Sequence, residues 1–433
     1  MKMNELAAEL NRMLERTVAG DMLSPFGRRM YFPKGIIAQC AEAKQQATRH
    51  NATAGVAMSN GQTMHLQDIY NQFSPEAFAP NDIFNYAPAG GDPRLRNLWR
   101  QAMLDKNPSL AGTPVSLPIV TAGLTHGISV AAQLFIGEGD PVVLPDLYWD
   151  NYDLIFTDLC QADIRTFPLF DAQSRFNVSA MKETLASCGG KGRLLLNFPN
   201  NPTGYTPSVA EMHLIVDALV ELAEGGMRLV VISDDAYFSL FYEDDTCRES
   251  LFAYLAGAHE NILAVKGDAA TKEDMVWGFR VGFLTFGCKG FSEAQYGALL
   301  KKTMGAIRCT VSSCDRPGQS LLIRAMEDGR TYQADKDCAK REMERRYRKF
   351  IDALKRHADT SLLTPYPFNS GYFMAFRCAG DAEVLRRRLL DAYHVGTVNI
   401  LGKTLRVAYC SVECDRIDDL VDIVYQAAEE AWK

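Results

Sequence analysis

The feature that most constrains the fold is a short run of residues at 229–233, with the sequence LVVIS. A strand with this sequence is apolar on both faces, which is typical of a strand buried inside a parallel sheet. Similar short apolar runs recur along the chain, at 118–121, 140–144, 193–198 and 262–265. Helical stretches separate these runs, and strands that alternate with helices form βαβ units. The sequence therefore predicts an α/β core.

The two ends of the chain differ from this core. The first residues predict an amphipathic helix at 6–14, an irregular segment rich in Gly and Pro at 24–35, and a helix at 36–49. Beyond residue 330, a highly charged stretch at 332–357 predicts a long, solvated helix. Strand-like segments at 370–377 and 404–408 follow, and Asp415 is positioned to cap a closing amphipathic helix. These last hundred residues suit a smaller α+β domain.

The length of the chain is consistent with more than one domain. At about 100–200 residues per domain, 433 residues predict two to four domains. The change of pattern near residue 330 favours two. We expect a large domain over residues 51–330 and a small domain built from residues 1–50 and 331–433 together.

Composition excludes several classes of protein. Hydrophobic residues make up 47% and charged residues 23%, as in ordinary globular proteins. The net charge of −7 argues against nucleic acid as the main partner. The eleven cysteines form no C-x-x-C and no zinc-type cluster, so we expect reduced thiols, no metal and a cytoplasmic location. The first twenty residues lack the apolar core of a signal peptide, and no run of eighteen apolar residues predicts a membrane span.

Polar residues typical of a catalytic site follow several predicted strands. The stiff loop NFPNNPTGY at 197–205 comes directly after an apolar strand, at the strand end where open α/β sheets bind ligands. The buried run at 229–233 leads into Asp234, and a carboxylate in that place needs a partner. Lys272 then precedes Arg280 by eight residues. It is the order of these groups along the chain that identifies the site.

This order resembles the fold-type-I enzymes that use pyridoxal 5′-phosphate (PLP), specifically the class I/II aminotransferases related to aspartate aminotransferase. The resemblance covers roughly residues 50 to 410. The matching positions are Tyr86, Gly91, Leu95, Arg96, Gly123, Leu124, Thr125, Trp149, Asn201 to Gly204, Asp234, Tyr237, Lys272 and Arg280. It implies a large domain with a mixed, mostly parallel seven-stranded sheet sandwiched by helices, and a smaller α+β domain.

The resemblance also implies roles for the residues at the reacting end of PLP. Lys272 holds the cofactor aldehyde as a Schiff base and later moves the proton between substrate Cα and the cofactor. Asp234 keeps the pyridine nitrogen protonated, and its neighbour Asp235 is the alternative, one step off the family register. Asn201 and Tyr237 hydrogen-bond the phenolic oxygen of the ring. Lys272, Asp234 and Tyr237 are therefore the predicted catalytic residues.

Other positions match the residues that hold the ring and the phosphate. A predicted helix begins at the turn at Gly123, and its first backbone N–H groups, at Leu124 and Thr125, suit an anion such as phosphate. The guanidinium group of Arg280 can add bidentate, charged hydrogen bonds. Trp149 offers a flat face to the ring, although Tyr148 or Tyr152 could replace it. Tyr86, in the family, reaches the phosphate of the neighbouring subunit, which implies a homodimer with shared sites. The sequence departs from the family at Ala269, where many members carry a serine, and Thr271 is not expected to replace that hydroxyl.

The substrate carboxylate needs a cation, and an arginine suits it best. Arg406, within the segment LRVA, matches the family's substrate arginine, with Asn201 beside it. Arg308 is a candidate for a second carboxylate, as in dicarboxylate-specific relatives. The alternatives belong to the segment at 24–35, which could close over the substrate through cations or line a pocket with aromatic rings: Arg28, Arg29, Lys34, Phe26, Tyr31 and Phe32.

The function that this resemblance implies is transamination between an α-amino acid and a 2-oxo acid, with 2-oxoglutarate as the expected acceptor and a ping-pong cycle. A PLP-dependent C–S or β-lyase would use the same cofactor residues. An aminotransferase-like transcription regulator is disfavoured, because only about fifty residues precede the predicted core and they show no basic helix-turn-helix pattern. The identity of the substrates is left open by the sequence.

Overall fold

A mixed seven-stranded sheet forms the centre of the molecule in a computed structural model that describes residues 3–33 and 35–432. The strand order is β4 (Ile119–Ala122), β10 (Val281–Gly287), β9 (Ile262–Ala269), β8 (Arg228–Asp234), β7 (Lys191–Asn197), β5 (Pro141–Pro145) and β6 (Asp163–Phe167). Strand β10 runs antiparallel to both of its neighbours, and β9, β8, β7, β5 and β6 pair in parallel. The expected mixed, mostly parallel sheet is thus confirmed.

Strand β8 contains the LVVIS run and lies between β7 and β9. Leu229, Val231 and Ile232 are all buried, as a strand with two apolar faces requires. The register aligns Asn197 at the end of β7 with Asp234 at the end of β8. The carboxyl ends of these parallel strands therefore present polar side chains at one edge of the sheet.

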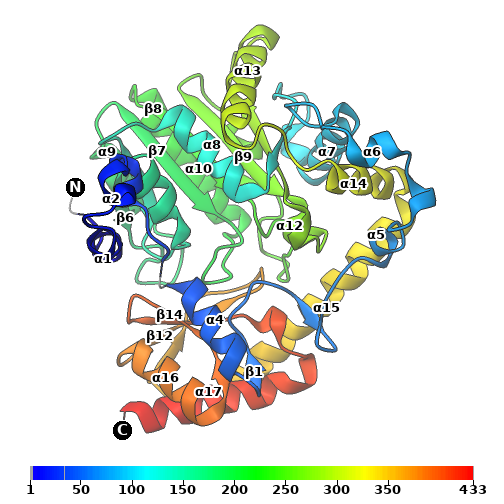
Figure 1. Ribbon diagram of the computed structural model, residues 1–433. Coiled ribbons are helices and arrows are strands. Elements are labelled where there is room, and N and C mark those ends of the chain that lie inside the picture. The colour runs from blue at the N-terminus through cyan, green and yellow to red at the C-terminus, as the bar shows by residue number, and fades with distance from the viewer. Residues whose placement is uncertain (1–2, 34, 433) are drawn as a thin grey trace.

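Helices cover the seven-stranded sheet, and Figure 1 shows them around it in the upper part of the molecule. They are α7 (Pro93–Lys106), α8 (Leu124–Phe135), α9 (Val178–Ala186), α10 (Val209–Glu224), α11 (Leu251–Leu255), α13 (Glu293–Thr310) and α14 (Pro317–Asp328). Helix α8 packs on β4, β9 and β10. It begins at Leu124, because Gly123 turns the chain at a φ of 79° and serves as its N-cap.

A second, four-stranded sheet lies in the lower part of Figure 1. Its order is β11 (Leu363–Pro365), β12 (Met374–Cys378), β15 (Thr404–Val407) and β14 (Val398–Ile400), all antiparallel. The helices α4 (Ile36–Gln46), α16 (Ala382–Tyr393) and α17 (Ile417–Trp432) accompany it. The helix expected at 332–357 is α15 (Arg330–Lys355), which packs against α14 and α17. It is not solvated on all sides, because Tyr347 and Phe350 on one face are buried.

Three local expectations were wrong. Residues 25–29 form a short helix, α3 (Pro25–Arg29), because Ser24 caps it and Pro25 suits its first turn. The strand expected from 370 begins at Met374, because the N–H groups of Ser370 and Gly371 donate to Gly204 and Leu240 instead. The closing helix begins at Ile417, and Asp415 belongs to a short 3₁₀ turn before it.

Apart from short 3₁₀ turns, the other helices and strands are short segments. They are α1 (Glu5–Met13), α2 (Val18–Met22), α5 (Gln67–Tyr70), α6 (Pro80–Phe84), α12 (Ala270–Glu273), the strand pairs β1 (His50–Asn51) with β13 (Val395–Gly396) and β2 (Met58–Ser59) with β3 (Gln62–Thr63), and the π-helix η3 (Asp153–Leu159). The N-terminal helices α1 to α3 lie beside η3 and β6, on the side of the seven-stranded sheet. Within residues 3–33 and 35–432, no helix combines the length and apolarity needed to cross a membrane.

Candidate active site

A cavity of about 330 Å³ lies where the carboxyl ends of β7 and β8 face the N-terminus of α8 and strand β15. Nine of the predicted site residues line it: Leu124, Thr125, Trp149, Asn201, Asp234, Tyr237, Lys272, Arg280 and Arg406. They come from separate parts of the chain, and the two sheets bring them together. The volume falls in the range of cavities that bind small molecules.

Lys272 lies in the short helix α12, directly after β9, and its side chain is buried in the cavity. Burial lowers the pKa of Lys272 to about 8, helped by the nearby charge of Arg280 and opposed by Asp234. The ammonium nitrogen lies 5.1 Å from the centre of the Tyr237 ring. The backbone carbonyl of Lys272 accepts a hydrogen bond from the Tyr372 hydroxyl at 3.1 Å, which holds α12 in place. Near neutral pH a much larger fraction of this lysine is therefore neutral than of an ordinary lysine, and the neutral amine is the nucleophilic form.

Asp234 ends strand β8 and is 3% exposed. Its carboxylate accepts hydrogen bonds from the Tyr152 hydroxyl at 2.5 Å, the Ala236 N–H at 3.0 Å and the Asn197 amide at 3.2 Å. Burial raises the pKa of Asp234, and the hydrogen bond from Tyr152 opposes that shift. A carboxylate fixed in this way at the wall of a cavity can pair with a protonated ring nitrogen.

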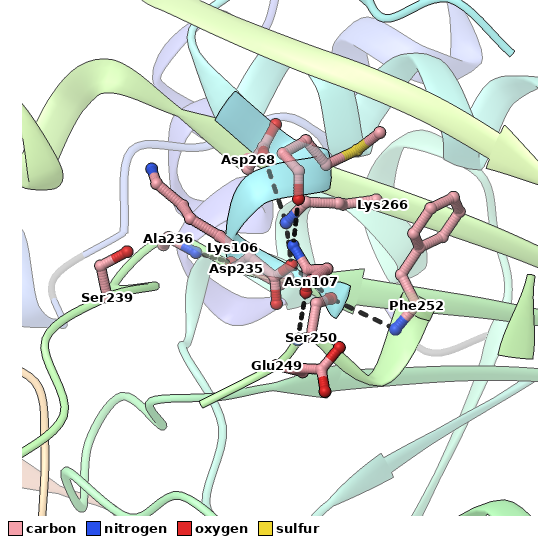
Figure 2. Close-up of polar contacts among 12 residues, drawn as sticks. Lys106, Asn107, Asp235, Ala236, Ser239, Glu249, Ser250, Phe252, Lys266 and Asp268 are labelled. Carbon is pink, nitrogen blue, oxygen red and sulfur yellow. Dashed lines mark hydrogen bonds and ion pairs between the residues drawn. The ribbon is translucent and has the colours of Figure 1, made fainter. Parts of the chain in front are cut away.

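The neighbouring carboxylate, Asp235, belongs to a different environment. Figure 2 shows it among Lys266, Ser250 and Asp268. It forms an ion pair with Lys266 and accepts a hydrogen bond from the Ser250 hydroxyl at 2.6 Å. Because Asp235 is occupied by these partners and Asp234 lines the cavity, the geometry favours Asp234 over Asp235 for the catalytic role.

Lys266 is the centre of this buried cluster, and its side chain has no exposed surface. Its ammonium group pairs with Asp235 and lies 3.2 Å from Asp268 Oδ2. The ammonium nitrogen also lies 4.6 Å from the centre of the Phe238 ring. Asp268 accepts a further hydrogen bond from the Trp99 indole at 3.1 Å. The cluster ties β8 to β9, the two strands that deliver Asp234 and Lys272.

The end of the cavity at α8 combines a helix N-terminus with an arginine. Gly123 packs against Arg280 so closely that a Cβ atom at Gly123 would lie 2.3 Å from Arg280 Nη2. A Cβ atom at Gly282 would meet the backbone of Gly123 at 2.5 Å, so both glycines are needed for this approach. The first N–H groups of α8, at Leu124 and Thr125, have no partner within the helix. Together these groups can bind a phosphate.

Two aromatic side chains lie at the cavity wall near Asp234. Trp149 is half-buried, and its ring meets the Tyr152 ring edge-on at 5.5 Å. The Tyr148 ring stacks on Tyr152 at 6.3 Å from outside the cavity, and its hydroxyl donates to Asp153 at 2.8 Å. Of the three rings considered from the sequence, Trp149 and Tyr152 line the cavity.

Arg406 projects from β15 at the opposite end of the cavity and is 2% exposed. Its Nη1 donates to Asn201 Oδ1 at 3.0 Å and its Nη2 donates to the Thr53 carbonyl at 2.7 Å. Its guanidinium carbon lies 4.3 Å from the centre of the Phe373 ring. Its Nε is buried and has no hydrogen-bond partner among the described residues. Because burial also lowers the pKa of Arg406, an anion bound here would relieve an unfavourable environment.

Several predicted residues lie away from the cavity. Tyr86 is 87% exposed, and Arg308 donates to the Ser312 hydroxyl at 2.7 Å at the end of α13. Arg28 donates to the Gly20 carbonyl at 2.7 Å, and Arg29 donates to the Asp158 carbonyl at 3.2 Å. Phe26, Tyr31 and Phe32 also lie outside the cavity lining, and Lys34 lies outside the described residues.

A family model described as aminotransferase class I and II matches residues 55–424. The chain belongs to this family. The match includes the loop at Asn201, the end of β8, Lys272 and Arg406, so it covers both ends of the cavity. It confirms the resemblance drawn from the order of motifs.

Individual aminotransferases are similar to parts of the chain. An aspartate aminotransferase from Musicola paradisiaca is 26% identical over 253 residues, which are 57% of this chain and 58% of that protein. A probable N-acetyl-LL-diaminopimelate aminotransferase from Bacillus subtilis is 28% identical over 204 residues, covering 47% of this chain and 48% of that protein. The sequence matches therefore span about half the length of these relatives.

Solved aminotransferase structures share the fold over nearly the whole chain. A crystal structure of an aminotransferase from Anaerococcus prevotii has a TM-score of 0.83 at 23% identity and covers 95% of this chain and 100% of its own. An aspartate aminotransferase from Thermus thermophilus with maleate has a TM-score of 0.73 at 19% identity, and covers 94% and 99%. The fold-type-I architecture of the family is thus present here.

The residues that line this cavity fit PLP. Asp234 offers a buried carboxylate, the α8 N-terminus with Arg280 offers an anion site, and Lys272 lies in the same cavity. The close packing of Gly123 and Gly282 leaves Arg280 beside the helix N-terminus. These groups match the pyridine nitrogen, the phosphate and the aldehyde of the cofactor in chemical type.

The sequence does not predict the positions of two hydroxyl groups in the site, those of Tyr152 and Thr271. The sequence indicates Tyr152 only as an aromatic ring beside the cofactor, whereas in the structure its hydroxyl donates a hydrogen bond to Asp234. Thr271 is not expected from the sequence to face the cofactor, but it lines the cavity, is 5% exposed and has a hydroxyl without a partner among the described residues. The sequence does hold one indication of this: Thr271 carries a hydroxyl next to Lys272, whereas Ala269, where many family members have a serine, carries none.

Proposed function

We propose that this chain is a PLP-dependent aminotransferase that moves an amino group between an α-amino acid and a 2-oxo acid. The observation that carries the proposal is one cavity with Lys272 in its wall, Asp234 on one side and the buried arginine Arg406 at its end. An arginine with an unpaired donor suits the α-carboxylate of an amino acid, and a lysine of lowered pKa suits capture of an aldehyde. The membership of the family supports the same activity.

Each residue has a proposed task. PLP, when bound, supplies an electron sink for the charge that develops at substrate Cα. Lys272 holds the cofactor at its Nζ and then moves a proton to and from Cα. Asp234 favours the protonated ring nitrogen, and Asn201 and Tyr237 donate to the ring oxygen. Arg406 orients the substrate carboxylate, so that the Cα proton faces Lys272.

The proposal is tested with ¹⁵N-labelled amino acids and a set of 2-oxo acids that includes 2-oxoglutarate. We expect the label in a new amino acid, with double-reciprocal plots that are parallel, as a ping-pong cycle requires. Labelled ammonia with loss of the substrate side chain would instead indicate the C–S or β-lyase reaction, for which the same cofactor residues would serve.

We also propose a homodimer with shared active sites. Tyr86 is 87% exposed, and three other aromatic side chains of the same region are exposed as well: Tyr70, Phe73 and Phe84. Exposed aromatic rings that gather in one region are typical of contact surfaces.

We also propose a division into two domains at residues 51 and 330, which the two separate sheets support, and a cytoplasmic location.

Replacing Arg406 by alanine is expected to raise the KM of every amino donor by about 100-fold, the effect of losing two charged hydrogen bonds. Arg406→Lys is expected to recover part of the loss, because it restores the charge without the planar fork. Steady-state kinetics with several donors measure the effect. A defect confined to dicarboxylic donors would show that Arg406 binds a side chain instead.

Replacing Thr271 by valine is expected to weaken PLP binding by about 10-fold, because the unpaired hydroxyl beside the cavity is then no longer a donor to the phosphate. The dissociation constant of PLP, followed by its visible absorbance, measures the effect. Thr63→Val, at an exposed position on β3, is the control. An unchanged constant in Thr271→Val would exclude this hydroxyl from PLP binding.

The lowered pKa of Lys272 predicts a pH dependence for the uptake of PLP. Protonated amines do not attack aldehydes, so uptake should rise with pH, reach half of its maximal rate near pH 8, where Lys272 is half neutral, and level off about one pH unit higher. At pH 7 this shift makes the neutral form about 300-fold more abundant than for an ordinary lysine. Rates of uptake by the apo-protein between pH 6 and 10 test this. A rate that still climbs toward pH 10 would show an unshifted amine.

A further inference from the structure

The end of the cavity around Arg406 is otherwise apolar. Ile36 and Cys40 from helix α4 line it together with Trp277 and Phe373. The Trp277 indole already donates to the Gly55 carbonyl at 2.9 Å. The Thr53 hydroxyl, in the same region, donates to Asn51 Oδ1 at 2.6 Å. The Trp277 indole and the Thr53 hydroxyl therefore already have hydrogen-bond partners within the protein. The surface that remains for a substrate side chain is apolar.

The cations of the cavity are already assigned to other groups. Among the described residues that line it, the cations are Lys272, Arg280 and Arg406. Arg280 lies against Gly123 at the phosphate end. Arg406 is the receptor for the α-carboxylate, and Lys272 is required for the chemistry. A second carboxylate on the substrate would therefore find no further cation among the described residues of this chain that line the cavity.

Apart from Arg406, the charged side chain that meets this apolar wall at Ile36 is a carboxylate, that of Asp150, and not a second cation. The Asp150 carboxylate accepts a hydrogen bond from the Ile36 N–H at 3.3 Å, at the start of α4. It also lies near enough to Arg406 to act on that guanidinium electrostatically. A substrate carboxylate beside Ile36 would meet this negative charge in a partly desolvated place, which costs free energy unless a cation compensates.

We propose that the amino donor of this enzyme carries an uncharged, apolar side chain, which packs against Ile36, Cys40 and Phe373. This inference rests on the proposed transamination and specifies its substrate class. With the α-carboxylate on Arg406 and Cα near Lys272, the side chain lies along the face of α4. Donors with a second carboxylate are disfavoured, although several relatives of the chain are named aspartate aminotransferases.

The first test compares donors on the holoenzyme. Leucine, methionine and phenylalanine should exceed aspartate and glutamate in kcat/KM by about 100-fold or more, since an unpaired charge in an apolar site is strongly rejected. Equal or better use of aspartate or glutamate overturns the proposal. Lys34→Ala and Arg308→Ala would then show which cation binds the second carboxylate.

A binding measurement separates this proposal from the proposed function. The dissociation constants of 4-methylpentanoate and of succinate for the holoenzyme are measured by calorimetry, which needs no turnover. Tighter binding of 4-methylpentanoate supports the apolar site even if no donor is transaminated. Tighter binding of succinate overturns it, whatever the activity.

Two variants locate the side-chain site. Ile36→Ala should lower kcat/KM for leucine by about 10-fold and leave aspartate unchanged. Cys40→Arg should raise kcat/KM for aspartate by about 10-fold and lower it for leucine, whereas Cys338→Arg, at an exposed position on α15, should change neither. Equal loss for leucine and aspartate in Ile36→Ala contradicts a contact with the side chain.

Discussion

Replacing Lys272 by alanine is expected to lower transamination by about 10,000-fold, because the proposed mechanism assigns both the covalent attachment and the proton transfer to this residue. The other cavity residues stay in place, so PLP should still bind, though without a covalent link. After reduction with borohydride, the wild-type chain should carry the cofactor on the peptide that contains Lys272, and the variant should carry none. No other lysine lines the same cavity among the described residues.

The matched control is Lys289→Ala, at an exposed turn after β10. It should keep both activity and covalent attachment. Cofactor found on another lysine of the Lys272→Ala variant, together with retained activity, would contradict the assignment of Lys272.

Replacing Lys266 by methionine is expected to reduce the free energy of unfolding by about 3–5 kcal/mol, the scale for removing one partner of a buried ion pair. The change leaves Asp235 and Asp268 without their common cation, in a place where the lysine side chain has no exposed surface. Denaturant unfolding of the apo-protein measures the loss. The side chain itself stays similar in size, so the packing changes little.

Lys182→Met is the control for this stability test. Lys182 forms an ion pair with Glu221 in which both side chains are substantially exposed, and such pairs are worth about 1 kcal/mol or less. If Lys266→Met were no more harmful than Lys182→Met, the cluster of Figure 2 would not hold the ends of β8 and β9 together.

The sequence predicted the core of the fold because its signal is local. The LVVIS run is apolar on both faces, and it is found in β8, at the centre of the seven-stranded sheet. Expectations failed where distant contacts decide the local structure. Ser370 and Gly371 leave the expected strand because their N–H groups donate to Gly204 and Leu240, which lie far away in the sequence.

In the candidate site, too, the sequence predicted which residues take part but not the contacts between distant parts of the chain. Lys272, Asp234 and Arg406 could be predicted from motif order, and all three line the cavity. The hydrogen bond between Arg406 and Asn201 joins residues 205 positions apart, so no local pattern could reveal it. The donor role of Tyr152 likewise depends on how η3 packs against the end of β8.

The central claim is that the amino group of the substrate passes to PLP and is held there until a 2-oxo acid arrives. The most direct measurement mixes the holoenzyme with leucine in the absence of any 2-oxo acid and analyses the products after acid release. Transamination predicts one equivalent each of 2-oxo acid and pyridoxamine 5′-phosphate per subunit, after which the reaction stops until 2-oxoglutarate is added. Continuous release of ammonia without pyridoxamine 5′-phosphate would contradict the account.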